Sequence, residues 1–93
     1  MMEQKKVIIS VVGKDTVGII AKVCTYLSEN GVNVLDISQT IVQDFFNMMM
    51  IVDMANAKVD FAGLQNGLGE LGQEIGVEIK AQKAEIFEMM HRL

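Results

Sequence analysis

The chain has 93 residues, of which 51% are hydrophobic and 22% charged, as is typical of one globular domain. Its formal net charge is −4 and its eight basic residues are scattered, which disfavours a nucleic-acid partner, since phosphate binding needs clustered Lys and Arg. No apolar run reaches the length of a membrane span, and the first residues lack the features of a signal peptide. A single cysteine, Cys24, excludes an internal disulfide. Together these features predict a cytoplasmic protein without a membrane partner.

The first predicted elements are a strand over Lys5–Val12 and a helix over about Val17–Asn30. Within the strand, Val7–Val12 is apolar and contains several β-branched residues, and only Ser10 interrupts it. The helix carries its apolar residues at helical spacing: Ile19, Ile20, Val23, Cys24 and Leu27. We expect the helix to end at Asn30-Gly31, because glycine suits the left-handed conformation that follows many helices.

Two further strands are predicted over Val32–Gln43 and Phe45–Met54, joined by a tight reversal at Asp44. In the second of them, one face is continuously apolar: Phe46, Met48, Met50, Val52 and Met54. In the first, simple alternation groups Leu35, Ile37 and Ile41 with Asn33 and Gln39. It places on the opposite face Val34, Asp36, Ser38, Thr40 and Val42.

The last elements are a helix over about Val59–Ile75, a strand over about Val77–Gln82 and an amphipathic helical tail over Lys83–Leu93. The middle helix carries four glycines, so tertiary packing must hold it. The order of elements predicts an α+β, ferredoxin-like βαββαβ two-layer sandwich with a short C-terminal helix. We expect one domain over residues 1–93, with a core at about 5–82 and the tail at 83–93.

The face of the predicted sheet that is turned away from the helices is too apolar to be exposed only to solvent. Alternation places there Ile8, Val12, Val34, Val42, Phe45, Met49 and Ile51. An exposed apolar patch of this size usually marks an interface, so we predict a homodimer. The pattern leaves open whether two copies pair edge to edge or face to face.

The stretch Val11–Ile20 joins the first strand to the first helix and contains two glycines. We expect Gly13 to adopt backbone angles closed to other residues, and Asp15 or Thr16 to cap the helix. Gly18 leaves the first helical turn without a side chain. Free N–H groups at a positive helix end then offer a place for an anion or a carboxylate. The alternative interpretation is an ordinary capped turn, since the glycine patterns of dinucleotide- and ATP-binding loops are absent.

Other reactive residues give no catalytic or metal pattern. His91 is the only histidine, and Cys24 on an apolar helix face is expected to act as a small hydrophobe. The run Met48–Met50 cannot converge on a soft metal, because successive side chains of a strand point to opposite faces. No pair of aspartates stands beside a nucleophile. We therefore predict no catalytic residue, no metal and no cofactor.

The turn Gly-Lys-Asp-Thr-Val-Gly-Ile-Ile at 13–20, followed by Asn-Gly-Val-Asn-Val-Leu-Asp-Ile-Ser-Gln at 30–39, resembles the ACT domain family. The resemblance covers about 5–82 and is strongest to stand-alone, single-domain bacterial members. It extends to the ACT regions of the glycine-cleavage repressor and of formyltetrahydrofolate deformylase. It implies a small βαββαβ module that binds amino acids and regulates metabolic enzymes.

In this family, the first turn of one subunit and the start of the second strand of its partner frame the effector. The resemblance therefore implies a ligand-binding set of Gly13, Lys14, Asp15, Thr16, Val17, Gly18, Asn33, Val34, Asp36 and Ile37. Many members carry Pro immediately before the second glycine. This chain has Val17 there, which makes the turn less rigid.

Two functions follow. The first is a non-enzymatic sensor, a homodimer that binds a small-molecule effector, an amino acid, between its subunits. The alternative is a protein–protein adaptor that docks a regulated enzyme or a regulator protein and has no effector. An enzyme in its own right is poorly supported by the residue pattern.

Overall fold

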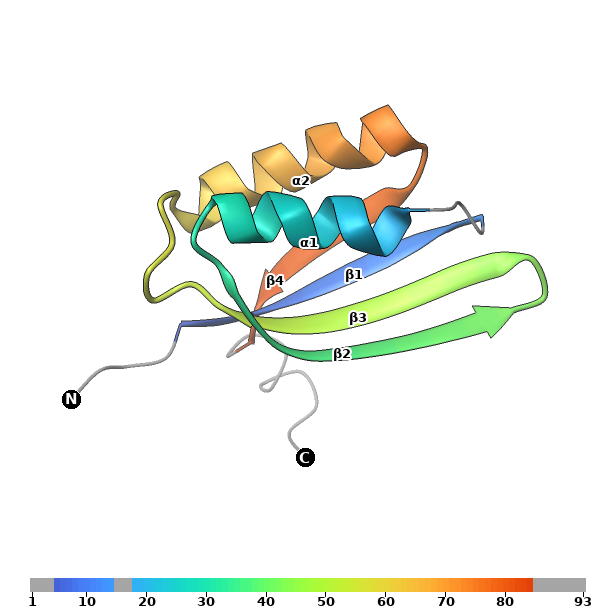
Figure 1. Cartoon of the computed structure of the whole chain (residues 1–93), viewed down its shortest axis with the longest axis horizontal. Coiled ribbons are helices and arrows are strands. Elements are labelled where there is room, and N and C mark those ends of the chain that lie inside the picture. Colours follow the sequence, from blue (N-terminus) through green and yellow to red (C-terminus); the bar gives the residue numbers. More distant parts are fainter. Residues whose placement is uncertain (1–4, 15–17, 85–93) are drawn as a thin grey trace.

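The computed structural model describes residues 5–14 and 18–84 of the chain. Its elements follow the predicted order (Figure 1): β1 Lys6–Lys14, α1 Ile19–Glu29, β2 Asn33–Val42, β3 Phe45–Asp53, α2 Phe61–Ile75 and β4 Glu78–Lys83. The expected C-terminal helix lies outside the described residues from position 85 on. Lys83, which was assigned to that helix, belongs to β4 instead.

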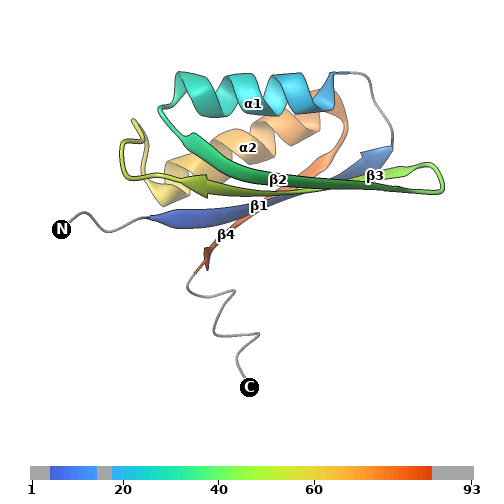
Figure 2. The same cartoon turned by 60° about the horizontal axis from the view of Figure 1, so that its bottom comes forward.

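The four strands form one antiparallel sheet in the order β2-β3-β1-β4. Both helices lie on the same side of this sheet, as Figures 1 and 2 show from two directions. The predicted ferredoxin-like α+β architecture is therefore confirmed. We call the side of the sheet without helices the open face. The strands β2 and β4 form the two edges.

The core lies between the helices and the two central strands. Alternate residues of β1 and β3 face the helices and are buried, and every second residue of β4 joins them. The side chains that are almost completely buried come from four elements: Ile9, Val11, Val23, Leu27, Met50, Val52, Leu64 and Leu68. The continuous apolar face predicted for the third strand is thus confirmed as part of the core.

Two glycines end the helices as the sequence predicts. Gly31 follows α1 with φ 72° and Gly76 follows α2 with φ 77°, both in the left-handed region that glycine adopts without a steric penalty. The Gly31 bend also brings the chain close to residues 56–58, because the Lys58 amide donates to the Asn30 carbonyl at 2.8 Å. This reversal sets the starting point of β2.

The strand β2 contains a β-bulge that simple alternation could not predict. Val34 lies opposite Val52 and Asp36 lies opposite Ile51, so Leu35 is an extra residue in the ladder. Because of the bulge, Val34 lies on the helix side and packs against the core. Its expected place on the open face is therefore wrong, and Asn33 moves to the open face with its partner Asp53.

The glycines of α2 allow neighbouring segments to approach the helix closely. A Cβ on Gly72 would lie 2.6 Å from the carbonyl oxygen of Val77, in the chain that enters β4. The same Gly72 carbonyl accepts the Val77 amide at 2.9 Å. By contrast, a Cβ on Gly69 would meet nothing within 4 Å. Only some of these glycines are therefore required by packing.

We predict opposite effects for Gly72→Ala and Gly69→Ala. The first forces a methyl group against backbone that cannot move away, and we expect it to destabilise the fold by about 1–3 kcal/mol. The second fills open space and removes a glycine from a helix interior, so it should stabilise the fold by up to about 1 kcal/mol. Urea unfolding of both variants measures the difference. Equal effects at the two positions would contradict this packing of α2.

Candidate functional site

The two halves of the predicted site lie at opposite ends of the sheet within one chain. At one end, Lys14 of β1 pairs with Phe45, and Phe45 pairs with Val42 of β2. At the other end, Asn33 pairs with Asp53, which also pairs with Lys6. The helix α1 separates them by 11 residues, or about 16 Å at 1.5 Å per residue. A single chain therefore does not bring the two halves together.

The first half is the turn of residues 13–18, of which Gly13, Lys14 and Gly18 are described. The predicted ligand residues Asp15, Thr16 and Val17 lie outside the described part of the chain. The helix starts at Ile19, and its N-cap position is Gly18 rather than Asp15 or Thr16. Gly18 has φ 89°, so the reason for a glycine here is its left-handed backbone and not a bare first turn inside the helix.

The other glycine of the turn is needed for packing. Gly13 is absent from the positive-φ residues of the described chain, so the expected unusual backbone is wrong. A Cβ at this position would lie 2.6 Å from the Val77 Cγ1 atom, which explains the missing side chain. By contrast, a Cβ on Gly18 would meet nothing within 4 Å. Among the described residues, nothing therefore blocks a molecule that approaches the start of α1 at Gly18.

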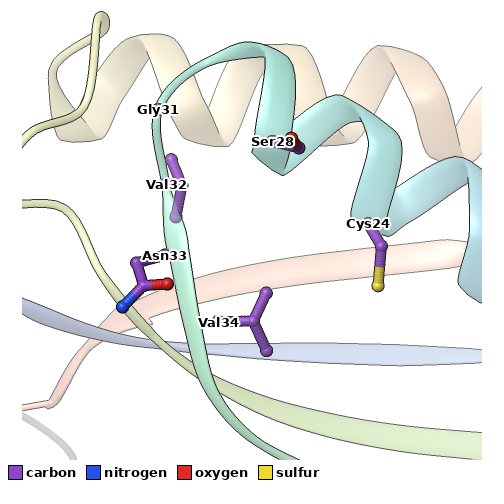
Figure 3. A pocket seen from close by; sticks show the side chains of 6 residues that line it. All are labelled: Cys24, Ser28, Gly31, Val32, Asn33 and Val34. Carbon is purple, nitrogen blue, oxygen red and sulfur yellow. The ribbon is translucent and has the colours of Figure 1, made fainter.

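The second half is an open hollow of about 390 Å³ between the C-terminal part of α1 and the start of β2 (Figure 3). We call it the edge pocket. Its lining residues are Cys24, Ser28, Gly31, Val32, Asn33 and Val34. The volume falls within the roughly 300–1,000 Å³ of small-molecule sites. None of these six side chains is charged.

In the edge pocket, the side chains of Cys24 and Val34 point into the space between α1 and β2, whereas the Asn33 carboxamide points away from it (Figure 3). The prediction from sequence included Asn33 and Val34 but missed Cys24 and Ser28. These two residues are four positions apart on α1 and so share a face of the helix. That spacing in the sequence could have predicted that both side chains line the same pocket. The two other predicted ligand residues of β2 lie on opposite faces of the sheet: Ile37 lies on the helix side and Asp36 on the open face.

A second hollow of about 350 Å³ lies between the outer surfaces of α1 and α2. It is lined by Ala21, Lys22, Thr25, Tyr26, Glu29, Leu71 and Glu74. Burial, and then the negative charge of Glu70, raises the pKa of Tyr26, so this hydroxyl stays protonated at neutral pH. A protonated phenol is a weak nucleophile, so this hollow is not a candidate for nucleophilic catalysis by Tyr26.

The described residues contain neither a cluster of metal ligands nor a membrane-spanning helix. Within 5–14 and 18–84, three or more His, Cys, Asp or Glu side chains nowhere gather in a way that could hold a metal ion. The two described helices are each too short or too polar to cross a membrane. What the described residues offer a ligand is therefore backbone N–H groups at α1, the amide of Asn33 and the uncharged edge pocket.

These features define a small two-layer βαββαβ domain with an open helix start at one end of the sheet and a pocket beside its edge strand at the other. The sequence profile of the ACT domain family matches residues 5–82, and this chain belongs to that family.

Individual relatives agree with this assignment. A UPF0237 protein from Bifidobacterium longum is 64% identical over 88 residues, which cover 95% of this chain and 98% of the relative. The solved structure of an ACT domain protein from Streptococcus pneumoniae has a TM-score of 0.82 and 44% identity, and the match covers 92% of this chain and 97% of that one. A putative glycine cleavage system transcriptional repressor shares the fold, with a TM-score of 0.75, 20% identity, and 86% of this chain matched to 46% of its own.

Substitutions at Gly18 test the geometry of the turn. We predict that Gly18→Ala destabilises the fold by about 1–2 kcal/mol, because a Cβ disfavours the left-handed backbone even where space is free. Gly18→Asn should cost less, since asparagine adopts this conformation more readily. Thermal unfolding of the two variants beside the parent chain measures both values. A loss for Asn as large as that for Ala would show that backbone conformation is not the constraint.

Proposed function

We propose that this chain is a non-enzymatic regulatory domain, acting in the cytoplasm, that binds an amino acid at an interface between two copies of itself. The observation that carries the proposal is the separation of the two half-sites by the length of α1. A second copy is needed to bring the turn of residues 13–18 beside Asn33. Membership of the ACT domain family, whose domains are regulatory, supports the same conclusion.

The edge strand β2 offers the surface for that second copy. It has ten residues, its only charged side chain is Asp36, and it leaves Ile37 and Ile41 40% and 60% exposed. The opposite edge, β4, has six residues and carries charges at Glu78, Lys80 and Lys83. Charged, short edges resist pairing with another chain, whereas a long and apolar edge invites it. We therefore expect two copies to pair through β2.

Antiparallel pairing of two β2 strands would gather both half-sites. Such pairing reverses one copy relative to the other, so the Asn33 end of each strand lies next to the Val42 end of its partner. The Val42 end is also the end at which β1 runs into the turn, through the pairs Val42–Phe45 and Phe45–Lys14. Each end of the paired strands would therefore combine the turn of one copy with Asn33 of the other.

The chemistry of the two half-sites suits an amino acid. At the turn, Gly18 has no side chain, and the first N–H groups of α1 lie at the positive end of the helix, which favours a carboxylate. At the start of β2, the exposed side-chain oxygen of Asn33 can accept a hydrogen bond from an ammonium group. The uncharged edge pocket would receive the side chain.

Regulation would follow from the position of the ligand. A molecule that contacts two copies at once stabilises the paired state over the separate chains by its difference in affinity for the two. The concentration of one amino acid would then change the oligomeric state or its geometry. A regulated enzyme or regulator protein would respond to that change.

A protein–protein adaptor without effector is the second candidate, and the open face favours it. Four hydrophobic side chains lie there at 43–56% exposure: Val12, Val42, Phe45 and Met49. Exposed apolar patches of this kind mark interaction sites. Affinity capture of partner proteins with and without the twenty amino acids separates the two functions. Retention of the same partner under every condition supports the adaptor.

We predict that one amino acid raises the unfolding temperature of this chain clearly above the noise in a panel of twenty. Ligand at 100 times its dissociation constant adds about 2.7 kcal/mol to the free energy of unfolding. For a domain of this size, each kcal/mol corresponds to roughly 4–8 °C. Differential scanning fluorimetry at millimolar ligand measures the shift.

The matched variants are Asn33→Ala and Asn66→Ala. Asn66 is exposed on α2, away from both half-sites, so its replacement should leave the ligand-induced shift unchanged. Asn33→Ala should reduce the shift to less than half. A flat panel, or equal responses of the two variants, would contradict the sensor and favour the adaptor.

A further inference from the structure

We infer that the C-terminal segment of the same chain, residues 85–93, packs against the open face of the sheet and covers the end of that face around Ile8 and Ile51. The inference goes beyond the proposed function, since it needs neither a ligand nor a second copy. It divides the open face into a covered end and a free end, and so limits the surface on which a partner protein can bind.

Ile8 is buried on the side of the sheet that the two described helices do not cover. It alternates with Val7 and Ile9, which face the helices, so it lies on the open face between Ile51 of β3 and Gln82 of β4. Both described helices lie on the other side of the sheet (Figures 1 and 2). Nevertheless, Ile8 is only 8% exposed, and it does not belong to the hydrophobic cluster beneath the helices. This burial indicates that Ile8 has a cover on the open face.

The exposure of the open face increases from this end of the sheet toward the β2–β3 hairpin. Val12 lies on the same strand and the same face as Ile8, four residues or about 13 Å further along, and is 43% exposed. Met49 and Phe45 are similarly exposed, and both lie on the hairpin side of Ile8 in the register of β1 with β3. The cover is therefore confined to the end of the open face at which Ile8 lies.

The chain leaves the sheet at the same end. Lys83, the last residue of β4, pairs with Val7, and Ala84 directly follows it as the last described residue. Ala84 is also 8% exposed and, like Ile8, lies outside the hydrophobic cluster beneath the helices. Residues 85–93 therefore begin beside the covered end of the open face.

The sequence of residues 85–93 has the pattern and the length for this cover. Its apolar residues at the spacing of one helix face are Ile86, Phe87, Met90 and Leu93. Nine residues of helix extend about 13 Å. The hairpin end of the sheet, where Lys14 pairs with Phe45, lies about 23 Å from Val7 along β1. A helical segment can thus reach Ile8 but not the hairpin end, in agreement with the exposed residues there.

This arrangement determines the surface that is available to a partner protein. With the segment in place, the exposed apolar part of the open face lies toward the hairpin and consists of Val12, Val42, Phe45 and Met49. Ile8 and Ile51 become accessible only when the segment moves away. A partner that binds the whole open face would therefore have to displace the chain's own C-terminal segment.

Thiol labelling of chains with a single cysteine tests the cover. In a Cys24→Ala background, the first probe is Ile8→Cys, and iodoacetamide is the reagent under native conditions. The matched probe is Ile9→Cys, the next residue of β1, which faces the helices and is completely buried. Ile51→Cys is a milder second probe of the open face, because Ile51 is only half-buried beside Ile8.

Each probe is measured with three forms of the C-terminal segment. The first is the parent sequence. The second carries Phe87→Ser together with Met90→Ser, which removes apolar contacts from the predicted helix face. The matched control carries Glu85→Ser together with Glu88→Ser, two substitutions on the opposite face of the same predicted helix.

We expect the double substitution at Phe87 and Met90 to accelerate the labelling of Ile8→Cys and Ile51→Cys by about tenfold or more, because labelling follows the population of the uncovered state. Ile9→Cys should keep its rate, and the control pair should change none of the rates. Unchanged labelling of both open-face probes would overturn the inference. Equal acceleration of Ile9→Cys would do so too, since the segment would then support the whole fold and not cover one face.

Dilution identifies the copy of the chain that supplies the cover. A labelling rate of Ile8→Cys that does not depend on protein concentration supports a cover by the same chain. Faster labelling on dilution would assign the segment to a second copy and overturn the inference. Neither measurement involves an amino-acid ligand, so a failure of the proposed sensor would leave both results unchanged.

Discussion

The structure depends on the burial of one face of a four-stranded sheet beneath only two helices. The central strands β1 and β3 and the edge strand β4 gain most from this cover, and the best-buried side chains of the sheet belong to β1 and β3. The other edge strand, β2, extends past the helices together with the β2–β3 hairpin (Figure 1). Its exposed apolar residues and unpaired backbone groups are a direct result of that limited cover. The fold therefore presents an edge that a second copy can complete.

The same arrangement explains why the candidate site is divided. The helix α1 spans from the Gly18 turn to the edge pocket, so one chain can present the two half-sites only at a distance. In an antiparallel pair of β2 edges, a two-fold axis would place the first half-site of each copy beside the second half-site of the other. A dimer would then hold two complete sites. Binding and assembly would then be linked, since each ligand would contact both copies. That link is what a regulatory domain requires.

The sequence predicted the order of elements, the core face of β3 and the glycines at 31 and 76, because periodicity and helix-end chemistry are local signals. It could not predict the bulge at Leu35, which depends on the ladder with β3 and moves Val34 to the helix side. The role of Gly13 was also hidden, since it depends on Val77, which is distant in the sequence. The edge pocket combines α1 with β2, and only tertiary structure brings Cys24 beside Val34.

The most direct test of a shared site is the mixing of two defective chains. Asn33→Ala damages one half-site and Gly18→Asn obstructs the other, and each variant alone should bind the stabilising amino acid weakly. In a mixed dimer, the intact turn of one chain meets the intact Asn33 of the other, so one of two sites is restored. Calorimetric titration of the re-equilibrated equimolar mixture should therefore recover about a quarter of the sites of the parent protein, because half of the dimers are mixed. If the mixture binds no better than the separate variants, the site does not combine two copies.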